Sequence, residues 1–432
     1  MNLGIIFGLF LILVFLGIPI AMVLCFLGIL PNLLNPWFPA DTAYIIRAMI
    51  SGVNSFPLMA VPMFILSGNI MARGKISDKI FEFFSYFIAD KRAGLPIATV
   101  ITCLFYGAIS GSGPATCAAV GSMTIPIMTE FGYDKSFATA LVACAGALGV
   151  IIPPSIPLIF YGQSAGLSVS DLFIGGILPG LLFGLMLIIY AYYYCLKNGE
   201  DREKLKEYSR KVRIKGFLNL FKSSFFALLS PLIILGSIYS GIASPTEAAV
   251  ISVFYSLFIG LFIYKSIKIG DIYYIFKDSV KTYGGILFII AGATAFARVL
   301  AFMKAGLVIS NLITNVVSSK IGLLIIINIL LLFVGMIMDT SPAILILTPI
   351  FMPIISSYGI NPIHFGLIMV VNLAIGFVTP PVGVNLFVAS SLSDLPLEKI
   401  MVKALPFIIV FIIALLLITF IPQISLLLVG GK

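Results

Sequence analysis

Long apolar stretches dominate this chain, and short polar segments separate them. A membrane-spanning helix needs roughly 20 consecutive apolar residues, so the pattern predicts an all-α polytopic membrane protein. Two amphipathic segments, 75–90 and 305–318, are too polar or too short to span and are expected to be arm helices lying in the interface. The apolar stretches run at about 1–30, 43–72, 93–129, 135–167, 171–195, 217–241, 244–264, 283–303, 321–357, 362–391 and 402–429.

Three apolar stretches are interrupted by residues that end a helix. The interruptions are Ser-Gly-Ser-Gly-Pro at 110–114, Pro153-Pro154 and Pro380-Pro381. Proline removes a helix hydrogen bond, and inside a bilayer the freed carbonyls must face protein or a water-lined cavity. We therefore expect a re-entrant hairpin at 93–129 and discontinuous helices at 135–167 and 362–391.

An internal repeat relates these breaks. When the chain is aligned with itself so that Gly149 falls on Gly376, Pro153-Pro154 falls on Pro380-Pro381 without a gap. In this alignment, called the repeat register below, positions 110–160 share eight identities with 337–387, and five of the eight are Pro or Gly at helix breaks and turns. The repeat predicts two structurally equivalent halves, with a second re-entrant hairpin at 321–357.

Composition and charge exclude other classes and suggest an orientation. The chain is 60% hydrophobic and only 10% charged, which excludes a water-soluble enzyme or a nucleic-acid-binding domain. The net charge is +9, and two segments, 197–215 and 265–281, together carry +6 of it. We interpret these segments as cytoplasmic because basic loops stay on that side. Tracing the spans between them makes the two hairpins enter from opposite faces, so the repeat is inverted.

Inverted repeats with discontinuous helices are typical of transporters, in which unwound carbonyls coordinate Na⁺. Pairing each hairpin tip with its Pro-Pro break predicts two Na⁺ sites. The proposed ligands are Ser110, Gly149, Ile152 and Pro154 in the first site and Gly335, Gly376, Thr379 and Val382 in the second. The alternative is that Ser-Gly-rich turns only permit close helix packing. If Ser110 contributes only its backbone carbonyl, Ser110→Ala should have little effect.

Three polar residues in apolar surroundings are candidates for substrate binding: Ser112, Asp339 and Arg298. Asp339, at the second tip, either binds a cation or holds the tip together by accepting N–H bonds. Arg298 either pairs with a substrate carboxylate or snorkels to the interface.

Other unusual side chains are expected to be structural. Glu247 follows Ser244 and Pro245 in the pattern of a capping box. His364 is expected to pack or cap at a helix start. The five cysteines, which have no paired spacing, are expected to be small packing residues.

Several motifs together resemble the large membrane subunit of TRAP transporters, the tripartite ATP-independent periplasmic transporters. They are Ile-Ser-Gly-Ser-Gly-Pro-Ala at 109–115, Gly-Tyr at 132–133, Ile-Ile-Pro-Pro-Ser at 151–155, Leu-Pro-Gly at 178–180, Ser-Pro-Thr-Glu-Ala-Ala at 244–249 and Gly-Phe-Val-Thr-Pro-Pro-Val-Gly at 376–383. The resemblance runs from the first span to the C-terminus. It implies the same Na⁺ positions as those proposed above, and the two assignments are not independent of each other.

The resemblance implies a Na⁺-driven importer of an organic acid, of the sialic acid or C4-dicarboxylate class, in the bacterial inner membrane. Its implied partners are a periplasmic substrate-binding protein and a small membrane subunit of about four helices. The implied mechanism is an elevator, in which a transport unit slides against a scaffold. The alternative within this superfamily is a self-sufficient Na⁺/carboxylate symporter, and an intramembrane enzyme is disfavoured because one histidine without paired acids supplies no catalytic group.

This mechanism predicts a division of the chain into scaffold and transport segments. The transport unit is expected at 93–167 and 320–391, each a hairpin plus a broken helix. The remaining segments are 1–92 (scaffold and arm helix), 168–282 (scaffold with the basic loop 197–215), 283–319 (a span and the second arm helix) and 392–432 (the C-terminal span).

Overall fold

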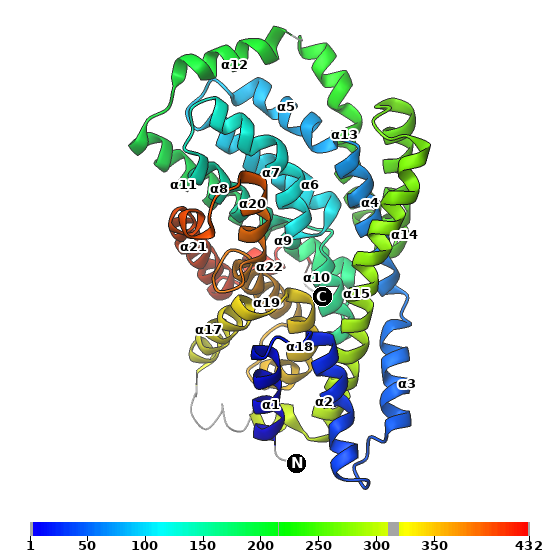
Figure 1. Cartoon of the computed structure of the whole chain (residues 1–432). Helices are drawn as coiled ribbons and strands as arrows, with labels where there is room; N and C mark the ends of the chain where they lie inside the picture. The colour runs from blue at the N-terminus through cyan, green and yellow to red at the C-terminus, as the bar shows by residue number, and fades with distance from the viewer. Residues whose placement is uncertain (1–2, 215, 310–318, 431–432) are drawn as a thin grey trace.

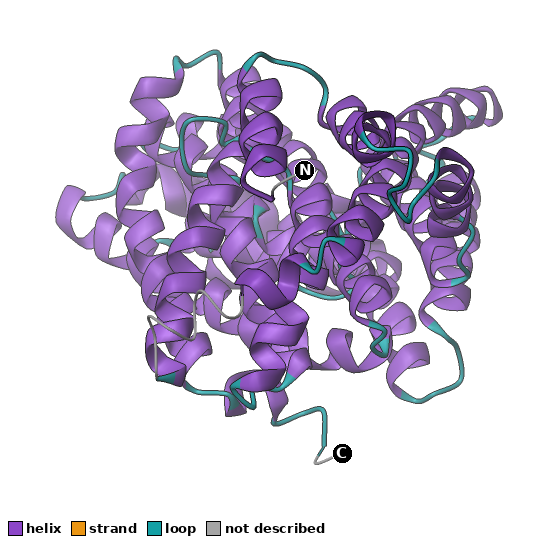
Figure 2. Ribbon diagram, turned by 90° about the horizontal axis from the view of Figure 1, so that it is seen from below, coloured by secondary structure: helices purple, strands orange, loops and turns teal. Residues whose placement is uncertain are grey.

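A computed structural model describes residues 3–214, 216–309 and 319–430. Within these ranges the chain forms helices and loops and no strand (Figure 2). Eight of the described helices are long and apolar enough to cross a membrane, or nine if a bent pair counts as one span. The all-α polytopic fold predicted from the apolar stretches is thus confirmed.

The helices fall into two series, joined by α11 and α12 and followed by α21 and α22 (Figure 1). The first series is α1 (Leu3–Phe15), α2 (Ile20–Leu34), α3 (Thr42–Val53), η1 (Pro57–Met59), α4 (Ala60–Arg73), α5 (Ile76–Ile88), α6 (Gly94–Ser110), α7 (Gly113–Glu130), α8 (Lys135–Gly146), α9 (Leu148–Ile151) and α10 (Ile156–Ala165). The connecting helices are α11 (Val169–Asn198) and α12 (Arg202–Ile214). The second series is α13 (Phe217–Tyr239), α14 (Pro245–Phe258), η2 (Ile259–Ile263), α15 (Ile269–Phe302), α17 (Lys320–Ile337), α18 (Thr340–Ser357), α19 (Pro362–Gly376) and α20 (Val384–Ser393), and the chain ends with α21 (Leu397–Phe420) and α22 (Gln423–Leu426).

Helix boundaries in the two series coincide in the repeat register. Helices α7 and α18 agree at both ends, and α3 and α15 agree at their starts, as do α8 and α19. The boundaries of α10 and α20 agree to within a single position. The correspondence therefore reaches beyond the hairpins and broken helices into the helices that surround them.

Packing between the two series is reciprocal. Helix α10 packs on α18 while its counterpart α20 packs on α7, and α2 packs on α15 while α4 packs on α14. Such exchange of contacts is what a two-fold axis produces. In Figure 1, α6 and α7 lie in the upper half of the molecule and α17 and α18 in the lower half.

Some predicted boundaries were wrong. The stretch 1–30 is not one helix but α1 and α2, because Gly17 (φ +79°) and Pro19 end the first helix. The stretch 43–72 is bent by 58° between α3 and α4, at Pro57, which lacks a backbone N–H. Its counterpart α15 is one continuous helix of 34 residues that begins well before the predicted start at 283.

The basic segment 197–215 is largely helical, as α12, rather than a plain loop. The first predicted arm helix corresponds to α5. Residues 310–318 of the second predicted arm helix lie outside the described part of the chain.

The side chains expected to be structural have structural environments. Ser244 and Glu247 form a reciprocal capping box at the start of α14. The backbone N–H of His364 donates to Asn361 Oδ1, and its Nε2 lies 3.3 Å from the carbonyl oxygen of Thr419. Four cysteines are buried, Cys25 is partly exposed, and all five are free thiols.

Candidate functional site

The first helix break lies between α9 and α10, where Pro153 and Pro154 cannot donate to the carbonyls of Gly149 and Val150 four residues earlier. Ser155 compensates one of these losses, because its Oγ donates to the Val150 carbonyl over 2.5 Å. The same Oγ accepts from the N–H of Leu158 and caps α10. The Gly149 carbonyl thus lacks its helical donor.

The first hairpin tip packs directly on this break. Gly111, in the left-handed region at φ +62°, turns the chain after α6, and its carbonyl accepts from the N–H of Ile156 over 3.3 Å. A Cβ built on Gly149 would lie 2.5 Å from the Ser112 carbonyl oxygen, and one built on Gly111 would lie 2.9 Å from the Pro154 carbonyl oxygen. The fold therefore brings Ser110–Ser112 and 149–154 together.

The second tip and break are joined in the same way. The N–H of Val382 donates to the Met336 carbonyl over 3.2 Å. Gly335 and Gly376 are in backbone contact, so that a Cβ on Gly376 would collide with the Gly335 carbonyl. Thr379 Oγ1 donates to the Ile375 carbonyl over 2.7 Å. All four residues proposed for the second site therefore lie at one junction.

Both junctions offer neutral oxygen atoms, and neither contains a cluster of acids. The described residues contain no group of three or more His, Cys, Asp or Glu side chains that could hold a metal. Backbone carbonyls and hydroxyls suit a hard cation, and unwound carbonyls in broken transporter helices coordinate Na⁺. The two junctions are therefore candidate sites for a monovalent cation.

Ser110 has a structural role that was not predicted from the sequence. Its Oγ lies 2.8 Å from Thr116 Oγ1, which donates in turn to the Ser112 carbonyl.

Ser110→Ala removes the hydroxyl that joins the two arms at the tip. One such hydrogen bond contributes about 1 kcal/mol, so we expect a loss of several-fold in the initial uptake rate rather than no effect. The control is Ser356→Ala, at an exposed serine whose hydroxyl bonds only within its own helix, and equal uptake by both variants would contradict this role.

Ser112 and Asp339 occupy equivalent positions in the repeat register. Each is the N-cap of the second hairpin arm, α7 or α18. The exposed Asp339 accepts from the Thr340 hydroxyl at 3.1 Å. A carboxylate at a helix start is favoured by the helix dipole, so the geometry is compatible both with holding the tip and with attracting a cation.

Arg298 is elsewhere, in a cavity of about 320 Å³ between α3 and α15 on one side and α10 and α18 on the other. Its polar lining consists of Ser51, Gln163, Ser164, Thr294 and Arg298. Neither Ser112 nor Asp339 lines this cavity, so the three predicted substrate-binding residues do not form one site. Among the described residues Arg298 has no ion-pair partner, which leaves its guanidinium available to an anion.

A second polar cavity, of about 650 Å³, lies between α4 and α5 on one side and α6 and α7 on the other. Asn69, Arg73, Lys75, Ser77 and Asp78 line it. Arg73 forms an ion pair with Asp278 at 3.2 Å. This cavity was not predicted from the sequence, although the Arg-Gly-Lys segment that ends the apolar stretch 43–72 was a signal for it.

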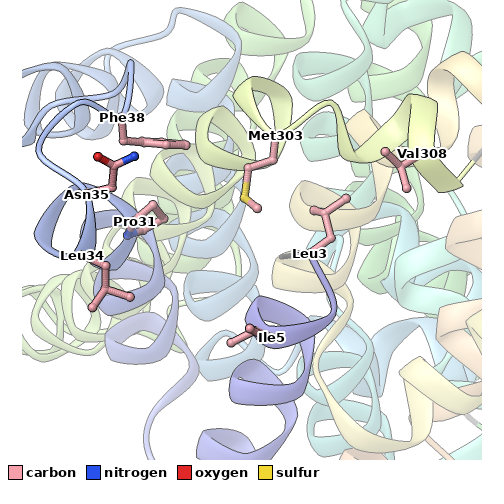
Figure 3. Close-up of a pocket in the computed structure, with 8 residues that line it drawn as sticks. All are labelled: Leu3, Ile5, Pro31, Leu34, Asn35, Phe38, Met303 and Val308. Carbon is pink, nitrogen blue, oxygen red and sulfur yellow. The ribbon is translucent and has the colours of Figure 1, made fainter. Parts of the chain in front are cut away.

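A third cavity, of about 540 Å³, is formed by the ends of α1, α2 and α15 (Figure 3). Its lining is Leu3, Ile5, Pro31, Leu34, Asn35, Phe38, Met303 and Val308. Asn35 is the only polar side chain among these, and none is charged, so this cavity is a poor candidate for binding a charged solute.

Sequence comparisons agree with this arrangement. The family described as "Tripartite ATP-independent periplasmic transporter, DctM component" matches residues 7–424. The chain is 41% identical to the isethionate TRAP transporter permease protein DctMQ of Oleidesulfovibrio alaskensis, over 99% of this chain and 66% of that protein. It is 40% identical to the C4-dicarboxylate TRAP transporter large permease protein DctM of Pseudomonas aeruginosa, over 86% of each chain. It is also 33% identical to the sialic acid TRAP transporter large permease protein SiaM of Vibrio cholerae, over 98% of this chain and 97% of that one.

Solved structures with a similar fold include two transporters of low sequence identity. The YdaH transporter of Alcanivorax borkumensis superposes with a TM-score of 0.64 at 13% identity, covering 88% of this chain and 89% of that one. MtrF of Neisseria gonorrhoeae, described as an antimetabolite efflux pump, superposes with a TM-score of 0.60 at 17% identity, covering 88% and 84%. Together with the family match, which spans nearly the whole chain, these findings identify the protein as a multi-pass membrane protein of the DctM family, the large permease component of TRAP transporters.

Proposed function

We propose that this protein carries out Na⁺-coupled import of an organic acid across the bacterial inner membrane, as the transport subunit of a tripartite system. One observation carries the proposal: each hairpin tip is hydrogen-bonded to a Pro-Pro break, and the two junctions offer neutral oxygen atoms at corresponding positions of the repeat. Ion and substrate sites formed by discontinuous helices of a repeat are typical of secondary transporters.

The proposed orientation rests on charge. Helix α12 and the segment 265–281 carry much of the positive charge, so their end of the molecule is assigned to the cytoplasm. The opposite positions of the two hairpins in Figure 1 support an inverted repeat. The cavity that holds Arg73 then faces the cytoplasm, and the cavity that holds Arg298 faces the other side.

The proposed mechanism is an elevator. Helices α6–α10 and α17–α20 form the transport unit, and α2–α4 with α13–α15 belong to the scaffold. Both polar cavities lie between these two groups of helices, where a sliding unit would carry a solute. Membrane transporters commonly alternate access by moving one bundle against another.

The proposed substrate is an anion with a carboxylate or a similar acid group. The guanidinium of Arg298, which has no ion-pair partner among the described residues, suits such a group because arginine binds carboxylates in a bidentate manner. The names of the relatives refer to isethionate, C4-dicarboxylates and sialic acid, all of them organic acids. Their family description also suggests the two partners, a periplasmic binding protein and a small membrane subunit.

The tripartite assignment is tested with purified protein in proteoliposomes that also contain the small subunit. Radiolabelled succinate, N-acetylneuraminate and isethionate are supplied with an inward Na⁺ gradient, with and without the matching binding protein. We expect uptake of one class of acid, and only when the binding protein is present.

The second candidate is a self-sufficient Na⁺/carboxylate symporter. It is favoured by the position of Arg298 in a cavity at the scaffold interface, which is sufficient in principle to bind a free acid. Uptake that continues at full rate without the binding protein would overturn the tripartite proposal and support this alternative.

A further inference from the structure

We propose that the cavities holding Arg298 and Arg73 are a pair of anion sites of unequal strength, and that Asp278 weakens the second. The statement that the transported acid uses these two cavities rests on the proposed function. The difference in electrostatic potential between the cavities does not depend on that function, so the two ideas can fail separately.

The two cavities occupy equivalent places in the two halves of the fold. Leu345 and Pro349 of α18 line the cavity that holds Arg298. Their counterparts in the repeat register, Ala118 and Ser122 of α7, line the other cavity. The two arginines lie near corresponding positions of α15 and α4.

The decisive difference is at one repeat position. Ser51 of α3 lines the Arg298 cavity. Its counterpart in the repeat register is Asp278 of α15, whose Oδ2 lies 3.2 Å from Arg73 Nη2. Thus Asp278, from the second half of the chain, pairs with Arg73 of the first half. Ser51, the corresponding residue of the first half, offers only a neutral hydroxyl to the Arg298 cavity.

This difference changes the charge balance of the two cavities. Arg298 is the only charged side chain among the described residues that line its cavity. In the other cavity Arg73 and Lys75 are opposed by Asp78 in the lining and by Asp278 in the ion pair. An anion is therefore attracted by one uncompensated charge in the first cavity and by none in the second.

The size of the two cavities acts in the same direction. Ala118 and Ser122 are smaller than Leu345 and Pro349, and the Arg73 cavity has about 650 Å³ against about 320 Å³. A wide cavity admits more water, which screens the attraction between charges. In the proposed orientation, an acid binds more strongly where it enters and less strongly where it leaves. The driving gradient still sets the final concentration ratio, while Asp278 sets the affinity on the release side.

The local potential can be measured without knowing the substrate. Cys25→Ser removes the one thiol that is not buried, and Ser122→Cys or Ser164→Cys then places a single reactive thiol in one cavity or the other. The full-length protein in nanodiscs is treated with an anionic reagent, 2-sulfonatoethyl methanethiosulfonate, and with its cationic trimethylammonium analogue. At each site we take the modification rate with the anionic reagent divided by the rate with the cationic reagent. This ratio, divided by the same ratio for a free thiol in solution, reports the electrostatic potential at the site.

We expect the anionic reagent to be favoured more strongly at position 164 than at position 122. Asp278→Ser should raise the ratio at 122 by about threefold or more, and Ser51→Asp should lower the ratio at 164 by a similar factor, as expected for one charge in or beside a hydrated cavity. Arg73 and Asp278 are about half exposed, with side-chain exposures of 47% and 56%, so loss of this ion pair should leave the fold intact.

Matched variants separate charge from shape. Asp278→Glu keeps the charge and Ser51→Asn adds bulk without charge, so both should leave the ratios unchanged. The difference between the rate ratios at positions 122 and 164 should also disappear in 1 M NaCl, where the screening length is about 3 Å. The proposal is overturned if Asp278→Ser leaves the ratio at 122 unchanged, if Asp278→Glu changes it equally, or if the differences persist at high salt. A normal electrostatic result in a protein that transports no acid would instead contradict the proposed function alone.

Discussion

Replacing Gly376 by alanine should strongly reduce Na⁺-dependent transport. A Cβ at this position would collide with the carbonyl of Gly335, which is rigid backbone rather than the end of a flexible side chain. The helix must therefore move away from the second hairpin tip, and the junction that holds four proposed ligands opens. Overpacking of this kind costs about 1–3 kcal/mol, and at about 1.4 kcal/mol for each factor of ten we expect uptake to fall by about five- to a hundredfold.

Gly149→Ala tests the first junction in the same way. Its Cβ would lie 2.5 Å from the Ser112 carbonyl oxygen, so a comparable loss is expected. The matched control is Gly284→Ala, because a Cβ there has no heavy atom within 4 Å. The readouts are the initial uptake rate and the rise in melting temperature when Na⁺ replaces choline. Both should be strongly reduced in Gly149→Ala and Gly376→Ala and kept in Gly284→Ala.

These variants also separate loss of ion binding from loss of the fold. A variant that still elutes as a monodisperse peak from size-exclusion chromatography, and that melts cooperatively without responding to Na⁺, has lost the site alone. If Gly376→Ala transports normally and keeps its response to Na⁺, the second junction is not an ion site.

The polytopic fold was predictable because the apolar stretches and their proline breaks are local properties of the sequence. Proline cannot donate a helix hydrogen bond wherever it lies, so both breaks were located correctly at Pro153-Pro154 and Pro380-Pro381. Boundaries that depend on tertiary context were not predictable. Pro57 signals a break in the apolar stretch 43–72 but does not give its angle of 58°, and nothing before 283 indicated that α15 begins at Ile269.

The two junctions were predictable for the same reason as the breaks. Gly149 and Gly376 correspond in the repeat register and lie beside the Pro-Pro pairs, and the repeat indicated which tip belongs to which break. Long-range pairing of charges was not predictable. The ion pair between Arg73 and Asp278 joins helices that are far apart in the sequence, and the sequence around one residue does not point to the other.

The three substrate-binding candidates were named from the sequence, but their surroundings in the fold were not predicted. Arg298 was identified as an isolated charge in an apolar run, but the cavity around it is built from four helices that no local pattern connects. Ser112 and Asp339 were identified from the tips, and they lie at helix starts outside that cavity. Sequence patterns thus singled out these three residues as candidates, whereas only the fold shows that they lie in different places.

Coupling to Na⁺ is the central claim, because cation binding is the role proposed for the carbonyl and hydroxyl oxygens of the two junctions. In proteoliposomes with the small subunit and the loaded binding protein, an inward Na⁺ gradient should drive accumulation of the acid. Replacing Na⁺ by choline, or supplying only an inward proton gradient, should reduce uptake to the level of empty vesicles.

The most direct measurement is the uptake of labelled acid with its coupled ²²Na⁺ flux in the same vesicles. The account predicts that both fluxes require each other, and that Gly376→Ala reduces both by the same factor. Accumulation of the acid at the wild-type rate in choline, with no ²²Na⁺ entry, would contradict it.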